Sequence, residues 1–245
     1  MTKAEIQFVR SLADKRARDA ERLFVAEGDK LIGEILQSNL KVRHLYALEG
    51  HFDMQAERVN EKEMERISQL KTASTSLAVV EQPRYAVAHS ASAEKLSLAL
   101  DGVQNPGNLG TIIRLADWFG VEDIYCSMDT ADCFNPKVVQ ATMGAILRVR
   151  VHYLPLADFL RRTRESGVEV YGTMLDGENI YDAELKPTGV IVMGNEGRGV
   201  SAECAASFSQ SLLIPAYSVA GQGSESLNVA MATGIVCAEF RRRSR

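Results

Sequence analysis

The first apolar pattern along the chain has the period of an α-helix. Between residues 5 and 22, apolar side chains recur every three or four positions, which predicts one amphipathic helix. Helical patterns and short apolar runs then alternate, so the first third of the chain is predicted to form a compact α/β unit. Its other predicted elements are helices over 28–38 and 61–69 and strands over 23–26, 42–48 and 77–80.

A change in composition marks the end of this unit. From Glu81 to Lys95 the chain contains a proline, then mainly small residues, which is typical of a linker. We therefore predict an N-terminal domain over 1–82, a linker over 83–95 and a second domain over 96–245.

The second domain again alternates short apolar strands with helices. Buried strands separated by helices indicate a parallel β-sheet that is covered on both faces. The predicted strands cover 96–100, 123–126, 149–153, 168–172, 190–193 and 212–214, and the predicted helices cover 108–119, 135–146, 156–165 and the chain from 226 onward.

Composition narrows the class of protein. A chain of 245 residues with 46% hydrophobic residues is long enough for two folded domains. It contains no run of eighteen apolar residues and no leader pattern, so we expect no membrane span and a cytoplasmic location. The net charge of −4 argues mildly against a non-specific nucleic-acid binder, although basic residues crowd both ends of the chain.

Cysteines and histidines give no sign of a metal site. The four cysteines are scattered among apolar neighbours without a CxxC pair, which favours reduced core residues. The four histidines are isolated from one another and from acidic clusters, so we expect no metal.

The loop over residues 101–114 is the first of three unusual loops in the second domain. Gly102, Pro106 and Gly107 shape its tight turn, and Asn108 stands where it could cap the following helix. Arg114 falls almost two turns into that otherwise apolar helix, where a guanidinium needs an anion or a cleft. Taken alone, the segment is better explained by a simple cap at Asn108 and an arginine whose head reaches solvent.

Two later loops are also rich in glycine. The turn over 194–199 follows a buried strand and holds Asn195, Glu196 and Arg198, but it lacks the GxGxxG order of a dinucleotide fold. A long Gly/Ser loop leads into the last helix, and its Ser226 and Asn228 are either helix caps or site residues.

Together these segments resemble a known family. NPGNLGTIIRLAD, VMGNEGRGVS and IP followed by SLNVAMATGI are similar, in order and spacing, to the three motifs of the SpoU (TrmH-like) RNA 2'-O-methyltransferases. The N-terminal domain resembles the small ribosomal-protein-like RNA-binding domain that many members carry. The resemblance implies an α/β fold with a C-terminal trefoil knot and a homodimer.

The same resemblance implies a cofactor and a set of site residues. S-adenosylmethionine would be held in a bent form by the loops over 193–197 and 214–228, mainly through backbone groups. The residues implied for cofactor binding are Thr173, Gly194, Ile214 and Leu227, and those implied for catalysis are Arg114, Asn108, Glu196, Ser226 and Asn228.

The implied chemistry is direct displacement at the sulfonium methyl by a ribose 2'-hydroxyl. The Arg114 guanidinium would steer phosphate and stabilise the developing alkoxide, and acting as the base itself would require a phosphate to relay the proton. Two departures affect the cofactor loop: Ala216 stands where methionine is common, and the stretch over 216–225 is longer than usual.

Two other functions remain open at this point. One is a catalytically inert RNA-binding or ribosome-assembly module of the same fold, and the other is a nucleotide-dependent oxidoreductase. The retained polar residues favour the enzyme, and the form of the N-terminal domain favours structured ribosomal RNA over transfer RNA.

Overall fold

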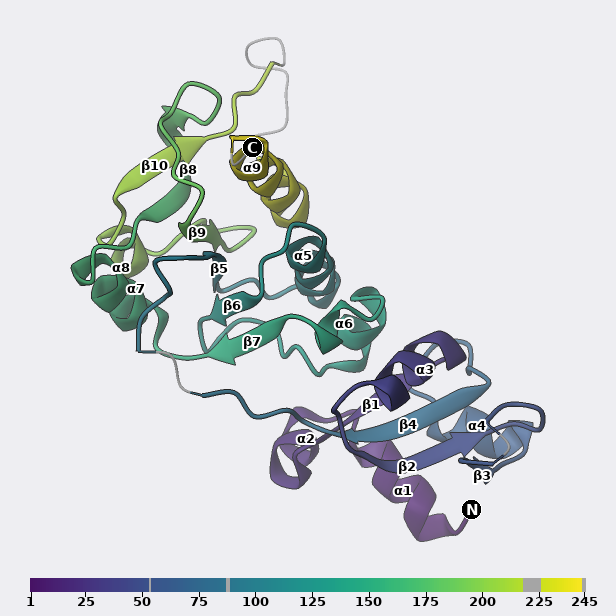
Figure 1. Ribbon diagram of the computed structural model, residues 1–245. Coiled ribbons are helices and arrows are strands. Elements are labelled where there is room, and N and C mark those ends of the chain that lie inside the picture. The colour runs from purple at the N-terminus through teal and green to yellow at the C-terminus, as the bar shows by residue number, and fades with distance from the viewer. Residues whose placement is uncertain (53, 87–88, 218–225, 244–245) are drawn as a thin grey trace. The chain divides into compact units, whose positions relative to one another are not determined.

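The computed structural model describes residues 1–52, 54–86, 89–217 and 226–243 (Figure 1). The chain forms two compact units. Unit 1 consists of Met1–Arg84 and Asp132–Leu147, and unit 2 consists of Tyr85–Ala131 and Arg148–Arg245. The segment Asp132–Leu147 thus belongs to unit 1, although it lies between the two segments of unit 2 in the sequence.

Unit 1 is built around a four-stranded sheet with the strand order β1-β4-β2-β3. β4 is antiparallel to both β1 and β2, so its carboxyl end lies beside the amino ends of those two strands. The elements of unit 1 are β1 (Leu23–Glu27), β2 (Val42–Ala47), β3 (Glu57–Arg58), β4 (Ser76–Glu81), α1 (Lys3–Ser11), α2 (Lys15–Glu21), α3 (Asp29–Gln37), α4 (Glu61–Ile67), α6 (Pro136–Ala141) and the 3-10 turn η1 (Ala145–Leu147).

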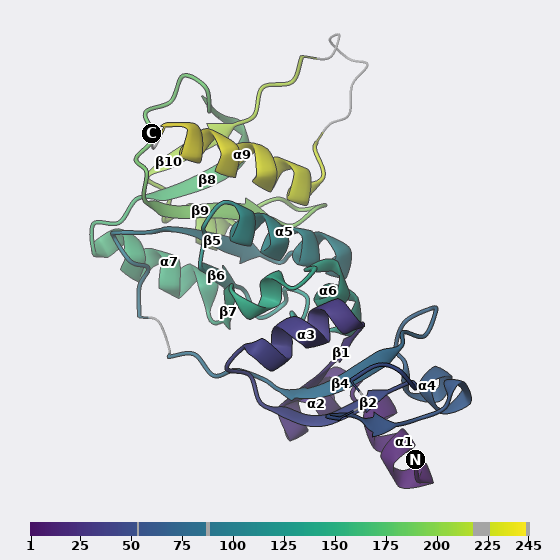
Figure 2. The same cartoon turned by 45° about the vertical axis from the view of Figure 1, so that its right-hand side comes forward.

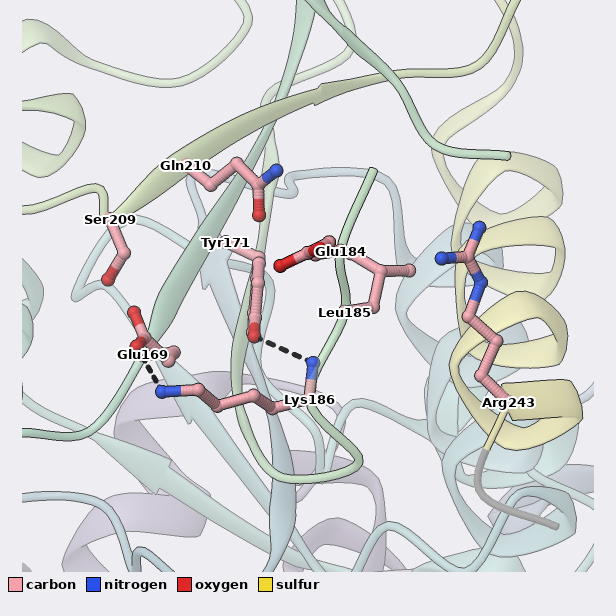
Figure 3. A pocket seen from close by; sticks show the side chains of 8 residues that line it. All are labelled: Glu169, Tyr171, Glu184, Leu185, Lys186, Ser209, Gln210 and Arg243. Carbon is pink, nitrogen blue, oxygen red and sulfur yellow. Dashed lines mark hydrogen bonds and ion pairs between the residues drawn. The ribbon is translucent and has the colours of Figure 1, made fainter. Parts of the chain in front are cut away.

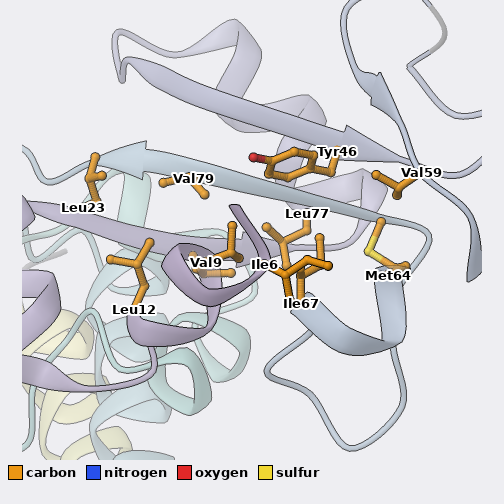
Figure 4. Close-up of a cluster of buried hydrophobic side chains, with 11 residues drawn as sticks. Ile6, Val9, Leu12, Leu23, Tyr46, Val59, Met64, Ile67, Leu77 and Val79 are labelled. Carbon is orange, nitrogen blue, oxygen red and sulfur yellow. The ribbon is translucent and has the colours of Figure 1, made fainter. Parts of the chain in front are cut away.

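The two faces of this sheet pack into separate cores. Leu23 and Val25 of β1 contribute to a cluster with α1 and α4 (Figure 4), whereas the intervening Phe24 contributes to a cluster with α3 and with Val139 of α6. Successive strand residues point to opposite faces, so β1 and β4 are buried on both sides. The side chain of Val139 makes α6 part of the unit 1 core.

The predicted helix over residues 5–22 is wrong in one respect, because two helices occupy that range. Asp14 begins α2 as its N-cap, with its carboxylate accepting from the backbone N–H of Arg16 at 2.7 Å. An aspartate offers a helix start that is more favourable than continuation through it. The apolar period continues across the break, so periodicity alone did not reveal it.

The predicted helix over 135–146 is likewise shorter than expected. α6 ends at Ala141, and Met143 and Gly144 then take positive φ values of 51° and 90°. A Cβ atom on Gly144 would lie 2.6 Å from a carboxylate oxygen of Glu34, so glycine fits both the backbone and the space.

A buried ion pair attaches the segment Asp132–Leu147 to the N-terminal part of unit 1. Arg18 of α2 donates from Nε (3.0 Å) and Nη2 (2.6 Å) to the Asp132 carboxylate, and from Nη1 to the carbonyls of Leu12 and Ala13. The two side chains are 2% and 11% exposed. The guanidinium therefore has charge compensation and several hydrogen-bond acceptors inside the protein.

Unit 2 contains the predicted parallel sheet, with six strands in the order β10-β8-β9-β5-β6-β7 and parallel pairing throughout. α5 and α9 lie together on one face and α7 and α8 on the other (Figures 1 and 2). The elements are β5 (Leu96–Asp101), α5 (Pro106–Trp118), β6 (Asp123–Cys126), β7 (Arg150–Tyr153), α7 (Leu156–Glu165), β8 (Val170–Asn179), β9 (Gly189–Gly194), α8 (Ala202–Ala205), β10 (Gln210–Leu213) and α9 (Val229–Arg243).

The α/β class with a parallel sheet is confirmed. The trefoil knot stays a prediction, because residues 218–225 of the implied knotted loop lie outside the described residues. The four cysteines are free and buried, and burial raises the pKa of the Cys237 thiol to about 12. In the described part of the chain, no helix is long and apolar enough to cross a membrane.

Candidate functional site

The carboxyl ends of the parallel strands of unit 2 bring together three of the predicted site residues. Asn228 donates from its side-chain amide to the Asn108 side-chain oxygen at 2.9 Å. Asn108 in turn donates from its amide to a carboxylate oxygen of Glu196, also at 2.9 Å. A single hydrogen-bonded chain thus connects the start of α9, the first turn of α5 and the turn after β9.

The Asn108 side chain can form both of these hydrogen bonds because another residue caps α5. The N-cap is Asn105, whose side-chain oxygen accepts from the N–H groups of Gly107 (2.8 Å) and Asn108 (3.1 Å). The interpretation of Asn108 as the cap is therefore wrong. Asn228 does act as a cap, since its side-chain oxygen accepts from Ala230 and Met231.

The turn that carries Glu196 is fixed by hydrogen bonds inside the turn and by a hydrogen bond to Gly102. The Asn195 side-chain oxygen accepts from the N–H groups of Gly197 (2.9 Å) and Arg198 (3.0 Å), and its amide donates to the Gly102 carbonyl at 2.6 Å. Gly102 stands at the end of β5, with a φ of 70°. Asn195 therefore joins the turn after β9 to the turn that leads into α5.

A second link runs through the end of β6. Ser127 accepts from the Gly102 N–H at 2.8 Å and donates to Asp129 at 2.6 Å, and Asp129 pairs with Arg198 at 3.2 Å. The Ser127 hydrogen bond, with smaller contributions from a backbone hydrogen bond and from Arg198, keeps the pKa of Asp129 below its usual value despite partial burial. Gly102, Ser127, Asp129, Arg198 and Asn195 thus form a closed ring of hydrogen bonds next to Glu196 in the sequence.

Three of the four residues implied for cofactor binding come from neighbouring strands. Thr173, Gly194 and Ile214 come from β8, β9 and the chain directly after β10, and β8 lies between the other two. The Thr173 hydroxyl donates to the Val192 carbonyl at 2.9 Å. A Cβ atom on Gly194 would lie 2.3 Å from the backbone of Gly199, so this position requires glycine.

The sheet opens beside these residues. β10 pairs with β8 at Gly172 and then at Glu178, so the five residues of 173–177 between them leave the ladder. Backbone groups outside a ladder are available for other partners. The strand ends therefore fit a ligand that is bound through backbone groups, as the predicted cofactor requires.

Arg114 is not joined to the hydrogen-bonded chain. It lies on an exposed stripe of α5 with Thr111 and Trp118, and among the described residues its side chain has no hydrogen-bond or ion-pair partner. Ser226 and Leu227 are also exposed and make no contact of that kind with Asn108 or Glu196. An exposed and unpaired guanidinium is available to an anion from outside the chain.

A cavity lies elsewhere in unit 2. It has a volume of about 740 Å³ and is lined by residues at the amino ends of β8 and β10, by residues 184–186 and by Arg243 of α9 (Figure 3). Three of its four charged side chains are paired, since Lys186 pairs with Glu169 at 2.6 Å and Arg243 binds backbone carbonyls and Glu239. Ligands of open parallel sheets bind at the opposite, carboxyl edge, so this cavity is not the candidate site.

The sequence interpretation missed Ser127 and Asp129 as part of the site. Both follow directly after β6, and residues after the carboxyl end of a parallel strand are candidates by position alone. Among the described side chains, no group of three or more His, Cys, Asp or Glu residues is arranged to hold a metal ion.

Comparisons with known proteins agree with this geometry. The model of the SpoU rRNA methylase family matches residues 95–238, and that of the MRM3-like substrate-binding domain matches residues 3–88. The 23S rRNA (guanosine(2553)-2'-O)-methyltransferase RlmP of Bacillus subtilis is 30% identical over 95% of this chain and 94% of its own length. The chain belongs to the SpoU rRNA methylase family.

Solved structures are similar along the whole chain. A putative RNA methyltransferase of the TrmH family from Porphyromonas gingivalis is 40% identical, with a TM-score of 0.87 and 99% coverage of both chains. An rRNA methyltransferase from Sinorhizobium meliloti, solved with AdoMet bound, is 33% identical with a TM-score of 0.87, covering 99% of this chain and 96% of its own.

Proposed function

We propose that the protein transfers the methyl group of S-adenosylmethionine to a ribose 2'-hydroxyl of structured RNA, and that this RNA is ribosomal rather than transfer RNA. The observation that carries the proposal is the chain from Asn228 through Asn108 to Glu196 at the ends of the parallel strands. Family membership and the ribosomal substrates named for its relatives support it.

The residues have distinct roles in this proposal. When bound, S-adenosylmethionine supplies an electrophilic methyl group on a sulfonium. Thr173, Gly194, Ile214 and Leu227 hold the cofactor, mainly through backbone groups. The hydrogen-bonded chain fixes the orientation of the Asn108 amide and the Glu196 carboxylate, since each has a partner at 2.9 Å. Such preorganised polar groups lower the cost of orienting the reactants.

Arg114 acts on the RNA in this proposal. Its guanidinium is permanently charged and unpaired among the described residues, so it binds phosphate and stabilises the alkoxide that develops on the ribose. Ser226, next to the cofactor-binding Leu227, contributes a hydroxyl that can donate or accept a proton.

The direct test uses the complete protein with labelled S-adenosylmethionine and separate pools of unmodified ribosomal and transfer RNA. We expect label in ribosomal RNA, recovered as alkali-resistant dinucleotides because a 2'-O-methyl group blocks cleavage at that position. Calorimetry with the cofactor alone separates the inert alternative. No binding at millimolar S-adenosylmethionine, together with no label in either pool, would refute the enzyme.

We also propose that the protein is a homodimer whose interface includes Trp118 of α5 and Met231 of α9. Trp118 on α5 is 83% exposed and Met231 on the neighbouring α9 is 64% exposed. Large apolar side chains on adjacent helices are typical of an interaction surface.

The four buried thiols fit the reducing cytoplasm, where we expect the protein to work.

Trp118→Glu is therefore expected to convert the dimer into a monomer. Light scattering after size exclusion should give about twice the 26.9 kDa chain mass for the wild type and the single mass for the variant. Met54→Glu is the matched control, because Met54 is 97% exposed and lies on unit 1. A wild type that runs as a monomer, or a Trp118→Glu variant that stays dimeric, would contradict this interface.

A further inference from the structure

Three arginines from separate parts of the sequence lie together where β1 and β2 begin and β4 ends, at one end of the strands of the unit 1 sheet. Arg22 directly precedes β1, Arg43 lies in β2, and Arg84 follows β4. The carboxyl end of β4 lies beside the amino ends of β1 and β2, which explains the convergence. Together with Leu23, Gln82 and two glutamates they line a hollow of about 190 Å³, which we call the arginine notch.

The charges of the notch are incompletely compensated. Glu21 and Glu81 also line it, so three positive charges face two negative ones. Among the described residues that line the notch, one ion pair forms, from Arg43 to Glu81 at a long 3.3 Å, and Arg43 stays 60% exposed. In the described part of the chain, the side chains of Arg22 and Arg84 have no hydrogen-bond or ion-pair partner.

Two of the three arginines sit at irregular backbone positions. Arg22 ends α2 in the left-handed region, with φ 55° and ψ 41°, where glycine is the usual residue. Arg43 stands at a register shift of β2, between Val42 opposite Val80 and His44 opposite Val79. A bulge redirects a side chain, and a non-glycine residue in the left-handed region is a reason to look for a function.

The notch is also rigid. Gln82 donates from its backbone N–H to the Arg22 carbonyl at 2.8 Å, and from its side-chain amide to the carbonyls of Arg18 (3.3 Å) and Leu23 (3.2 Å). These bonds hold the end of β4 against the turn that carries Arg22. Arginines on a fixed frame lose less entropy when they bind a ligand than arginines on a flexible loop.

We propose that the arginine notch binds the phosphate backbone of the RNA substrate. Guanidinium groups form paired hydrogen bonds to phosphate oxygens, and a hollow with excess positive charge suits a phosphodiester better than a base. The inference rests on the proposed function, because it identifies a contact of unit 1 with the same RNA. In this proposal the three arginines contribute to RNA affinity and take no part in methyl transfer.

The test measures equilibrium binding of the complete protein to an unmodified transcript of 23S ribosomal RNA over a range of salt concentrations. Arg22→Gln with Arg84→Gln is expected to weaken binding about tenfold at low salt and to reduce the slope of log K against log salt by about 1 to 2. Arg10→Gln with Arg66→Gln is the control, because both residues are exposed in unit 1 and lie outside the notch. Equal losses in the two variants would overturn the proposal.

A second variant separates a structural role from a binding role. Arg22→Gly relieves the left-handed conformation, so it is expected to raise or preserve the melting temperature while it weakens RNA binding. Wild-type affinity in this variant would count against the notch. Binding of inorganic phosphate alone to the wild type, with RNA affinity unchanged in all notch variants, would assign the notch to a free anion and refute the RNA contact.

A methyl-transfer assay distinguishes failure of the notch proposal from failure of the proposed function. At saturating RNA, the notch variants should keep kcat within about twofold of the wild type and raise KM, as expected for lost binding energy alone. A wild type that binds RNA through the notch but transfers no methyl group would refute the proposed function only. A wild type that methylates RNA, with notch variants unchanged in KM and affinity, would refute the notch only.

Discussion

Arg114→Ala is expected to lower the rate of methyl transfer to RNA by about 10²–10³-fold, the usual loss when one electrostatic stabiliser of a transition state is removed. Binding of S-adenosylmethionine should stay close to that of the wild type. The reason is positional: Arg114 lies on the exposed stripe of α5, whereas Thr173, Gly194 and Ile214 lie within β8, at the end of β9 and directly after β10. Single-turnover transfer of labelled methyl groups and calorimetry with the cofactor measure the two effects.

The control for this experiment is Arg164→Ala. Arg164 is an exposed arginine of α7, and α7 lies on the sheet face opposite α5 (Figure 1). The Arg164→Ala variant should retain wild-type activity. Full activity in Arg114→Ala would remove this residue from the mechanism, and loss of cofactor binding in parallel with activity would indicate structural damage instead.

The parallel sheet could be predicted from the sequence because its strands are buried on both faces. Runs such as 96–100 and 123–126 are mainly apolar, with one polar residue each, and alternate with helical patterns. That combination has few solutions other than a covered parallel sheet. The helix Leu156–Glu165 was predicted to the residue, since its apolar face is clear and a proline precedes it.

Breaks in helices were harder to predict, because they depend on local hydrogen bonds that periodicity does not record. The break at Asp14 and the end of α6 before Met143 both interrupt an apolar pattern that continues in the sequence. β3, with two residues, is too short to give a pattern at all. The membership of Asp132–Leu147 in unit 1 depends on tertiary contacts between distant residues and left no local signal.

The site residues were predicted from the three sequence motifs. The pattern of apolar and polar positions alone could not have brought them together. Asn108, Glu196 and Asn228 are separated by 88 and 120 positions from their hydrogen-bond partners along the chain, so only the fold brings them together. The cap was assigned to the wrong asparagine, because Asn105 and Asn108 both precede the apolar part of α5. Proline at the first helical position favours Asn105 as the cap, and that signal was present in the sequence.

The ion pair between Arg18 and Asp132 gives the largest expected effect on stability. Asp132→Ala leaves a guanidinium that is 2% exposed without its counter-charge, and removal of one partner from a buried pair costs about 3–5 kcal/mol. Asp19→Ala is the matched control, because Asp19 pairs with Lys15 on the same helix at the same 2.6 Å but both side chains are more than half exposed. Such surface pairs contribute about 0–1 kcal/mol.

Hydrogen exchange of the β1 and β4 amides is the suitable measurement, since it reports the opening free energy of unit 1 separately from unit 2. Arg18→Met combined with Asp132→Ala removes both charges, so it should recover a large part of the loss seen in Asp132→Ala. An Asp132→Ala variant no less stable than Asp19→Ala would show that water compensates the guanidinium. The expected loss would instead show that residues 132–147, which the SpoU methylase model covers, are needed for the stability of the unit that matches the substrate-binding domain.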